Sequence, residues 1–148
     1  MAIALDQTTR LEIRRTLRAP IDAVWAAWTD AAQVSQWMAP SDDFGPTEAT
    51  MDVRVGGRYR IVMRSPDGEM HRVTGVYEEV VPQRRLVYTW AWESTPERVS
   101  RVAVDLRPVD GGTELALTHD RFADTDARDK HNHGWQGCLA RFTRYVAS

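Results

Sequence analysis

The sequence predicts an α+β fold in which a curved antiparallel sheet of six or seven strands wraps around one long C-terminal helix. Two observations support this prediction. From about residue 50 to residue 120, apolar and polar side chains alternate with the period of half-buried strands. From about residue 125 the period becomes helical, and the apolar side chains form one stripe. The space between such a sheet and such a helix is where a ligand would fit.

The elements before this sheet are a strand and two short helices. Alternation of apolar and polar residues predicts a strand over Leu11–Leu17. Pro20 suits the first turn of a helix, where its missing N–H costs nothing, and apolar residues at helical spacing follow it. A second short helix is predicted over Ala31–Trp37. We expect it to end before Pro40, because a proline disfavours helix in the preceding residue.

Turn residues divide the middle of the chain into strands. Residues 41–50 are predicted to form a loop, and Gly56-Gly57, Ser65 to Gly68, Pro82 and Asp110 to Gly112 then separate the strands. One face of these strands is apolar and is assigned to the inside of the sheet. The side chains on this inner face are Tyr59, Ile61, Met63, His71, Val73, Tyr77, Leu86, Tyr88, Trp90, Trp92, Val102, Val104, Leu106, Leu115, Leu117 and His119.

The last helix carries its apolar stripe at Trp135, Cys138, Leu139 and Phe142. Residues 1–9 show no periodicity and are predicted to be an N-terminal tail, which leaves residues 10–148 as a single domain. Its length agrees with this division, since domains of about 100–150 residues are the commonest.

Composition excludes several classes of function. Nineteen basic and 21 acidic residues give a net charge of −2, which provides no basic surface for nucleic acid or anionic membranes. The single cysteine, Cys138, excludes an intramolecular disulfide, and no apolar stretch is long enough for membrane insertion. A soluble, cytoplasmic protein without a cofactor is therefore expected.

Several runs of the sequence, taken in order, resemble one family. They are Ala19-Pro20, Val24 to Asp30, Gln36-Trp37, Asp52 to Tyr59, Arg85 to Trp90, Gly111 to Leu115, His119 and Gly134-Trp135. The chain resembles the START-like superfamily, also called SRPBCC, and within it the bacterial homologues of the activator of the heat-shock chaperone ATPase. The resemblance covers about Leu11 to Val146. It departs from the family at Met38, where a second aromatic residue is usual.

This resemblance implies a helix-grip fold, with six or seven strands around the last helix, and an apolar cavity for a hydrophobic, aromatic or lipid-like ligand. The ligand would pass between residues 37–44 and the start of the last helix. Proteins with this scaffold include ligand-binding proteins, cyclases and co-chaperones, so the fold alone does not determine whether a reaction is catalysed. The predicted cavity residues are Trp37, Phe44, Tyr59, Ile61, Met63, His71, Val73, Tyr77, Tyr88, Trp90, Leu117, His119, His131, Trp135 and Leu139.

Each notable side chain has two interpretations. The tryptophans either stack on a ligand or fill the core, and the histidines either orient a ligand or are satisfied within the chain. Arg15 interrupts an apolar strand face, so it should hold a ligand carboxylate or a buried acid such as Asp52 or Glu48. His131 and His133 diverge on a helix and have no supporting metal ligands, so no metal site is expected.

The leading hypothesis is therefore a binding protein for a small hydrophobic ligand, without catalytic residues. Two alternatives remain open. One is an enzyme of the cyclase or dehydratase kind, acting on a polyketide-like substrate in the same cavity. The other is an interaction module that contacts a chaperone. A second copy of the chain, in a homodimer, is the remaining candidate partner.

Overall fold

The computed structural model describes residues 9–147 and shows one seven-stranded antiparallel sheet with three helices. Of the predicted N-terminal tail, only Thr9 lies within the described residues. The strands are β1 (Leu11–Leu17), β2 (Glu48–Met51), β3 (Arg58–Arg64), β4 (Met70–Val81), β5 (Arg85–Trp92), β6 (Ser100–Val109) and β7 (Gly112–Asp120). The helices are α1 (Ile21–Thr29), α2 (Ala31–Trp37) and α3 (Thr125–Ala147).

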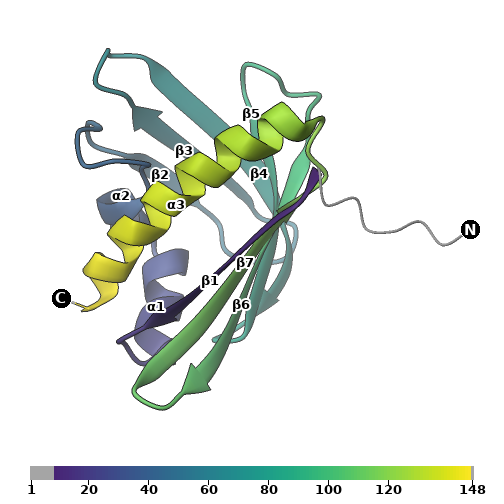
Figure 1. Ribbon diagram of the computed structural model, residues 1–148. Helices are drawn as coiled ribbons and strands as arrows, with labels where there is room; N and C mark the ends of the chain where they lie inside the picture. Colours follow the sequence, from purple (N-terminus) through teal and green to yellow (C-terminus); the bar gives the residue numbers. More distant parts are fainter. Residues whose placement is uncertain (1–8, 148) are drawn as a thin grey trace, which may run out of the picture.

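The strand order is β1-β7-β6-β5-β4-β3-β2, so the first strand pairs with the last and β2 forms the opposite edge. Helix α3 runs across the hollow of the bent sheet, and α1 and α2 lie near its C-terminal end (Figure 1). The predicted α+β architecture, with two short helices after the first strand and a long final helix, is confirmed.

Two local features position the short helices. The carbonyl of Pro20 accepts a hydrogen bond from the Val24 amide at 3.1 Å, so the proline lies one residue before α1 and not within its first turn. The Asp30 carboxylate accepts a bond from the Ala32 amide at 3.3 Å and thereby caps the start of α2.

One strand differs from the prediction. Residues 48–50 were expected to lie in a loop, but together with Met51 they form β2 and pair with β3, with Thr50 opposite Arg60. The strand is only four residues long and lies at the sheet edge, where burial alternates between exposed and half-buried. So short a segment carries too few alternations to be recognised from its sequence.

The β4–β5 ladder is interrupted beside Gly75. Pairing stops after Thr74 opposite Ala91 and resumes at Tyr77 opposite Tyr88. In the gap, the Tyr59 hydroxyl from β3 donates to the Thr89 carbonyl at 2.5 Å. A side chain on Gly75 would overlap both that carbonyl and the tyrosine ring, so glycine is what allows Tyr59 to pass.

Aromatic rings pack together where α1 and α2 meet the C-terminal half of α3. Trp28 lies 4.7 Å from Trp37 and 5.0 Å from Phe142, measured between ring centroids. The Trp37 indole donates to the Ala27 carbonyl at 2.8 Å, so its polar edge is also satisfied. This half of the hollow is filled by side chains.

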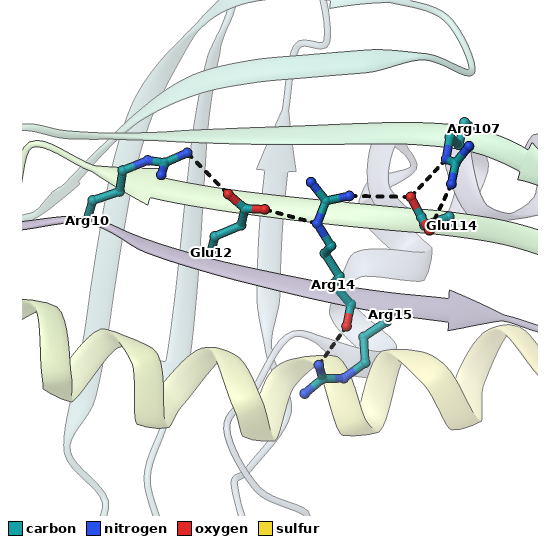
Figure 2. A network of polar contacts seen from close by, with 6 residues as sticks. All are labelled: Arg10, Glu12, Arg14, Arg15, Arg107 and Glu114. Atoms are coloured by element: carbon teal, nitrogen blue, oxygen red, sulfur yellow. Dashed lines mark hydrogen bonds and ion pairs between the residues drawn. The ribbon is translucent and has the colours of Figure 1, made fainter. Parts of the chain in front are cut away.

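Charged side chains form a ladder on the outer face of β1, β7 and β6 (Figure 2). Arg14 donates to Glu12 at 3.0 Å and to Glu114 at 3.4 Å, and Glu114 also binds Arg107. These pairs lie on the solvent side of the strands, as the alternation predicts.

Arg15 corrects one prediction. Its guanidinium lies between β1 and α3 (Figure 2), where it donates to the Arg14 carbonyl at 2.8 Å and to the side chain of Gln136. It therefore binds neither of the acids proposed for it, and Asp52 pairs with Arg54. Because Arg15 is only half-buried, a polar amide and a carbonyl are adequate partners and no buried acid is needed.

Across residues 9–147, none of the helices combines the length and the apolar composition that crossing a bilayer requires.

Candidate functional site

A cavity of about 500 Å³ lies between the N-terminal half of α3 and the sheet. Its walls come from four places: neighbouring parts of β3, β4 and β5, the loop after α2, the loop between β5 and β6, and the α3 face that carries Ala127, His131, Gly134 and Cys138. These helix positions recur at intervals of three or four residues, so one face of α3 looks onto the cavity. The filled core described above closes the far end.

Tryptophans provide most of the aromatic wall. Trp90 and Trp92 lie two residues apart on β5, and their rings meet edge to face at 5.5 Å. Trp135 comes from α3 and packs against Trp90 at 5.3 Å. Adjacent edge-to-face rings brace one another, which gives the cavity a rigid apolar surface.

His131 is held in one tautomer by two hydrogen bonds. The Trp92 indole N–H donates to His131 Nε2 at 2.9 Å, so this nitrogen carries no proton. His131 Nδ1 must then donate to the Ala127 carbonyl, which lies 2.7 Å away. Burial lowers the pKa of His131, although the Ala127 carbonyl opposes this shift. The imidazole is therefore neutral and both of its nitrogens are engaged.

His119 lies behind the aromatic wall and is fully buried. Trp135 Nε1 donates to its Nδ1 at 2.9 Å, so His119 Nε2 is the protonated nitrogen and donates to Ser100 Oγ at 2.7 Å. Ser100 in turn donates to the Trp90 carbonyl at 3.1 Å. Burial, with a smaller contribution from His131, lowers the pKa of His119 well below its ordinary value.

Trp90 contributes the unsatisfied polar atom of the wall. Its side chain is only 4% exposed, and its Nε1 is buried without a hydrogen-bond partner among the described residues. Buried donors in native proteins nearly always have a partner. Because this atom is inaccessible in the structure, a ligand or water molecule in the cavity could reach it only if the surrounding side chains moved.

The loop after α2 forms the opposite side of the cavity through Met38, Pro40 and Phe44. Asp42 fastens this loop to α3, since its carboxylate lies 2.9 Å from Arg144 and 3.2 Å from Arg141. The hydrogen bond from Arg144 is the main reason that the pKa of Asp42 is lowered.

A glycine of α3 allows the same loop to lie close. The Pro40 carbonyl oxygen occupies the place that a side chain on Gly137 would fill. A salt bridge and a close backbone approach thus set the position of this wall.

Charged groups surround the opening. Lys130 pairs with Asp126 at 3.1 Å, one turn apart on α3. The Asp124 carboxylate accepts a bond from the Ala127 amide at 2.8 Å and so caps the helix. Arg98, from the loop between β5 and β6, also lines the cavity and is exposed.

The structure distributes the predicted cavity residues between two places. Those at the cavity wall are Phe44, Met63, His71, Trp90, His131 and Trp135. Those buried elsewhere in the core are Trp37, Tyr59, Ile61, Val73, Tyr77, Tyr88, Leu117, His119 and Leu139. The second group belongs to the same apolar face of the sheet or helix, but to the part that α1, α2 and the rest of α3 cover.

Ten wall residues are absent from the predicted set of cavity residues, although Trp92 was among the tryptophans expected to stack on a ligand or fill the core, and Met38 and Pro40 lie in the region predicted as the entrance. The ten residues are Met38, Pro40, Trp92, Arg98, Asp124, Asp126, Ala127, Lys130, Gly134 and Cys138. Two signals were present for some of them. Trp92 continues the alternation of Trp90, and Ala127, His131, Gly134 and Cys138 repeat at helical spacing.

Neither the cysteine nor the second histidine of α3 is placed for catalysis or metal binding. Burial raises the pKa of the Cys138 thiol to about 12, so it remains protonated and unreactive at neutral pH. His133 is exposed and lies away from His131, as their spacing on a helix requires. Within residues 9–147, no three histidine, cysteine or acidic side chains gather as metal ligands would.

Comparison with known proteins gives a family for this fold and cavity. The family model described as Activator of Hsp90 ATPase homolog 1-like protein matches residues 18–147. No curated protein matches the chain. A solved AHSA1-like protein from Aeromonas hydrophila is 31% identical, with a TM-score of 0.77 over 93% of this chain and 92% of that one.

Two further solved structures show the same fold. A protein from Chromobacterium violaceum is 25% identical, with a TM-score of 0.83 over 95% of this chain and 98% of that one. A protein from Rhodobacter sphaeroides is 29% identical, with a TM-score of 0.80 over 95% of this chain and 93% of that one. The chain therefore belongs to the family of Activator of Hsp90 ATPase homolog 1-like proteins, in the START-like (SRPBCC) superfamily.

Proposed function

We propose that this protein binds a small molecule with an aromatic or otherwise apolar body in the cavity between α3 and the sheet. The observation that carries the proposal is the cavity itself, about 500 Å³ of unfilled space beside a tightly packed core. Protein interiors are normally close-packed, so an unfilled space of this size is typical of a site that binds a ligand. The volume falls within the range of ligand pockets, roughly 300–1,000 Å³.

The chemistry of the wall supports an apolar ligand. Trp90, Trp92 and Trp135 present ring surfaces, and Met63 and Phe44 add apolar side chains. The neighbouring imidazole, His131, is neutral and already hydrogen-bonded on both sides. Such a wall offers area for stacking and little competition from polar groups.

Gly134 allows the cavity to be blocked without damaging the core. It lies on the α3 face that looks onto the cavity, and a Cβ built on it meets nothing within 4 Å. A leucine in its place would extend into the empty space. The Gly134→Leu variant should lose binding of a naphthalene-based probe at least about tenfold while its unfolding temperature stays the same or rises.

Ala140→Leu is the matched control, because it adds the same side chain at an exposed position of the same helix. Titration of both variants and the parent, followed by tryptophan fluorescence and calorimetry, gives the comparison. Equal binding by all three proteins, or no detectable binding by the parent across a panel of aromatic and lipid-like compounds, would contradict the proposal.

The two alternatives from the sequence stay predictions. An enzyme of the cyclase or dehydratase kind would depend on His71, whose Nε2 lies 3.1 Å from Ser65 Oγ at the cavity wall. The nitrogens of His131 and His119 are already engaged within the chain. A chaperone partner rests on the family name alone, and a homodimer has no further support.

A further inference from the structure

We propose that Arg98 makes the cavity selective for carboxylates, so that its ligand is an amphipathic acid with an apolar body inside and a carboxylate at the opening. This inference rests on the proposed function, because it names the chemical class of the ligand in the same cavity. The observation behind it is a cation at the opening that has no charged partner within the described residues.

Arg98 occupies the loop between β5 and β6, which passes beside the N-terminal end of α3 (Figure 1). Its side chain lines the same cavity as Trp90 and Trp92, the last part of β5. A molecule in contact with these rings would share the cavity with the Arg98 guanidinium. The loop is anchored at its start, where Glu93 forms a salt bridge with Arg60 at 2.7 Å.

The other charges of the opening already have partners inside the chain. Asp126 and Lys130 neutralise each other at 3.1 Å. The Asp124 carboxylate binds the Ala127 amide at the start of α3, where the helix dipole favours a negative charge. Arg98 makes no ion pair with any described residue, its neighbour Glu97 included.

A guanidinium offers paired donors whose geometry matches the two oxygens of a carboxylate. Beside Trp92, the imidazole of His131 is neutral with both nitrogens engaged, and the tryptophan rings around it are apolar, so a negative charge would be poorly placed in this part of the cavity. The opening is therefore the place for the acid group, and the aromatic wall is the place for the rest of the molecule.

Three probes with the same ring separate this proposal from simple apolar binding: naphthylacetic acid, naphthylacetamide and naphthylethylamine. The acid should bind the parent protein about five- to tenfold more tightly than the amide, and the amine most weakly. The preference should shrink at high ionic strength, because the opening is exposed to solvent.

Arg98→Gln should abolish the preference for the acid and leave binding of the amide unchanged. Arg84→Gln is the matched control, since Arg84 lies in the turn at the opposite end of β5 and is exposed. Equal binding of acid and amide by the parent would overturn the role of Arg98 but leave the proposed function intact. Tightest binding by the amine would overturn it in favour of the acidic side chains. Failure of all three probes to bind would contradict both proposals.

Discussion

Trp92 Nε1 donates a hydrogen bond to His131 Nε2 at 2.9 Å, and this bond joins the last residue of β5 to α3 at the wall of the cavity. A second bond of the same kind lies deeper, from Trp135 Nε1 to His119 Nδ1 at 2.9 Å. In both pairs the imidazole acts as an acceptor, which only its neutral form can do. The contact between sheet and helix therefore depends on two unprotonated histidines.

We expect the free energy of unfolding to fall as the pH drops below about 6.5. In the folded protein the pKa of His119 lies well below 6.5, and that of His131 is also lowered. As the pH falls, the unfolded chain binds protons at these sites before the folded protein does, so acidification favours unfolding. The free energy of unfolding keeps falling until the pH reaches the pKa values of the folded protein. Each histidine contributes at most about 1.4 kcal/mol per pH unit.

Urea unfolding at several pH values between about 7.5 and 5 measures this slope, because the carboxylates titrate mostly below that window. His131→Gln keeps an acceptor for Trp92 but cannot titrate, so it should flatten the slope. The exposed His133 offers the control, and His133→Gln should leave the slope as it is. A parent protein equally stable at both ends of the window would contradict the role of the two imidazoles.

The salt bridge at Asp42 should control how often the loop after α2 leaves the helix. Asp42→Asn removes the charge that Arg144 and Arg141 contact at 2.9 Å and 3.2 Å. We expect amide exchange in residues 38–45 to become about two- to fivefold faster, the modest effect of a solvent-exposed ion pair. Hydrogen exchange followed by mass spectrometry measures it.

The neighbouring Asp43 provides the control for this prediction. It is exposed and accepts a hydrogen bond from Ser41 within its own loop, and it makes no contact with α3 that the structure records. Asp43→Asn should therefore leave the exchange of the loop unchanged relative to α3. Identical exchange in the parent and in Asp42→Asn would show that the close approach at Gly137 and the hydrogen bonds from Arg141 to the Ser41 and Gln36 carbonyls hold the loop without the Asp42 charge.

The sequence was sufficient to predict the order of the elements, apart from β2, and the buried face of most strands. Alternation identifies which side of a strand is buried, as at Tyr88 and Leu117. It does not say how far along the sheet each inner residue lies, and the cavity occupies only the part beside the N-terminal half of α3. This is why Tyr88 was assigned to the cavity although it belongs to the filled core.

The other differences between the predicted and the observed site also arise because local sequence patterns do not determine tertiary contacts. Arg98 reaches the cavity from a loop, where no periodicity indicates the direction of a side chain. Arg15 was expected to meet an acid because its charge interrupts an apolar face, but Gln136 lies opposite it across the gap to α3. Contacts between segments so far apart in sequence depend on the tertiary fold, which local patterns do not contain.

Gly75 should tolerate no side chain, because its α-carbon faces the Thr89 carbonyl and the Tyr59 ring. Alanine there would force Tyr59 to move and would break the bond that its hydroxyl donates to Thr89 at 2.5 Å. We expect Gly75→Ala to lower the free energy of unfolding by about 2–3 kcal/mol, the cost of overpacking a filled core. Gly134→Ala is the matched control: it adds the same methyl group to empty space in a helix, and it should raise stability by about 0.5–1 kcal/mol. Denaturant unfolding of both variants measures the two effects. A Gly75→Ala protein as stable as the parent would contradict this prediction. It would mean that β4 and β5 can move apart at this point without lowering the free energy of unfolding, so that the contact between Gly75 and Tyr59 is not tightly packed.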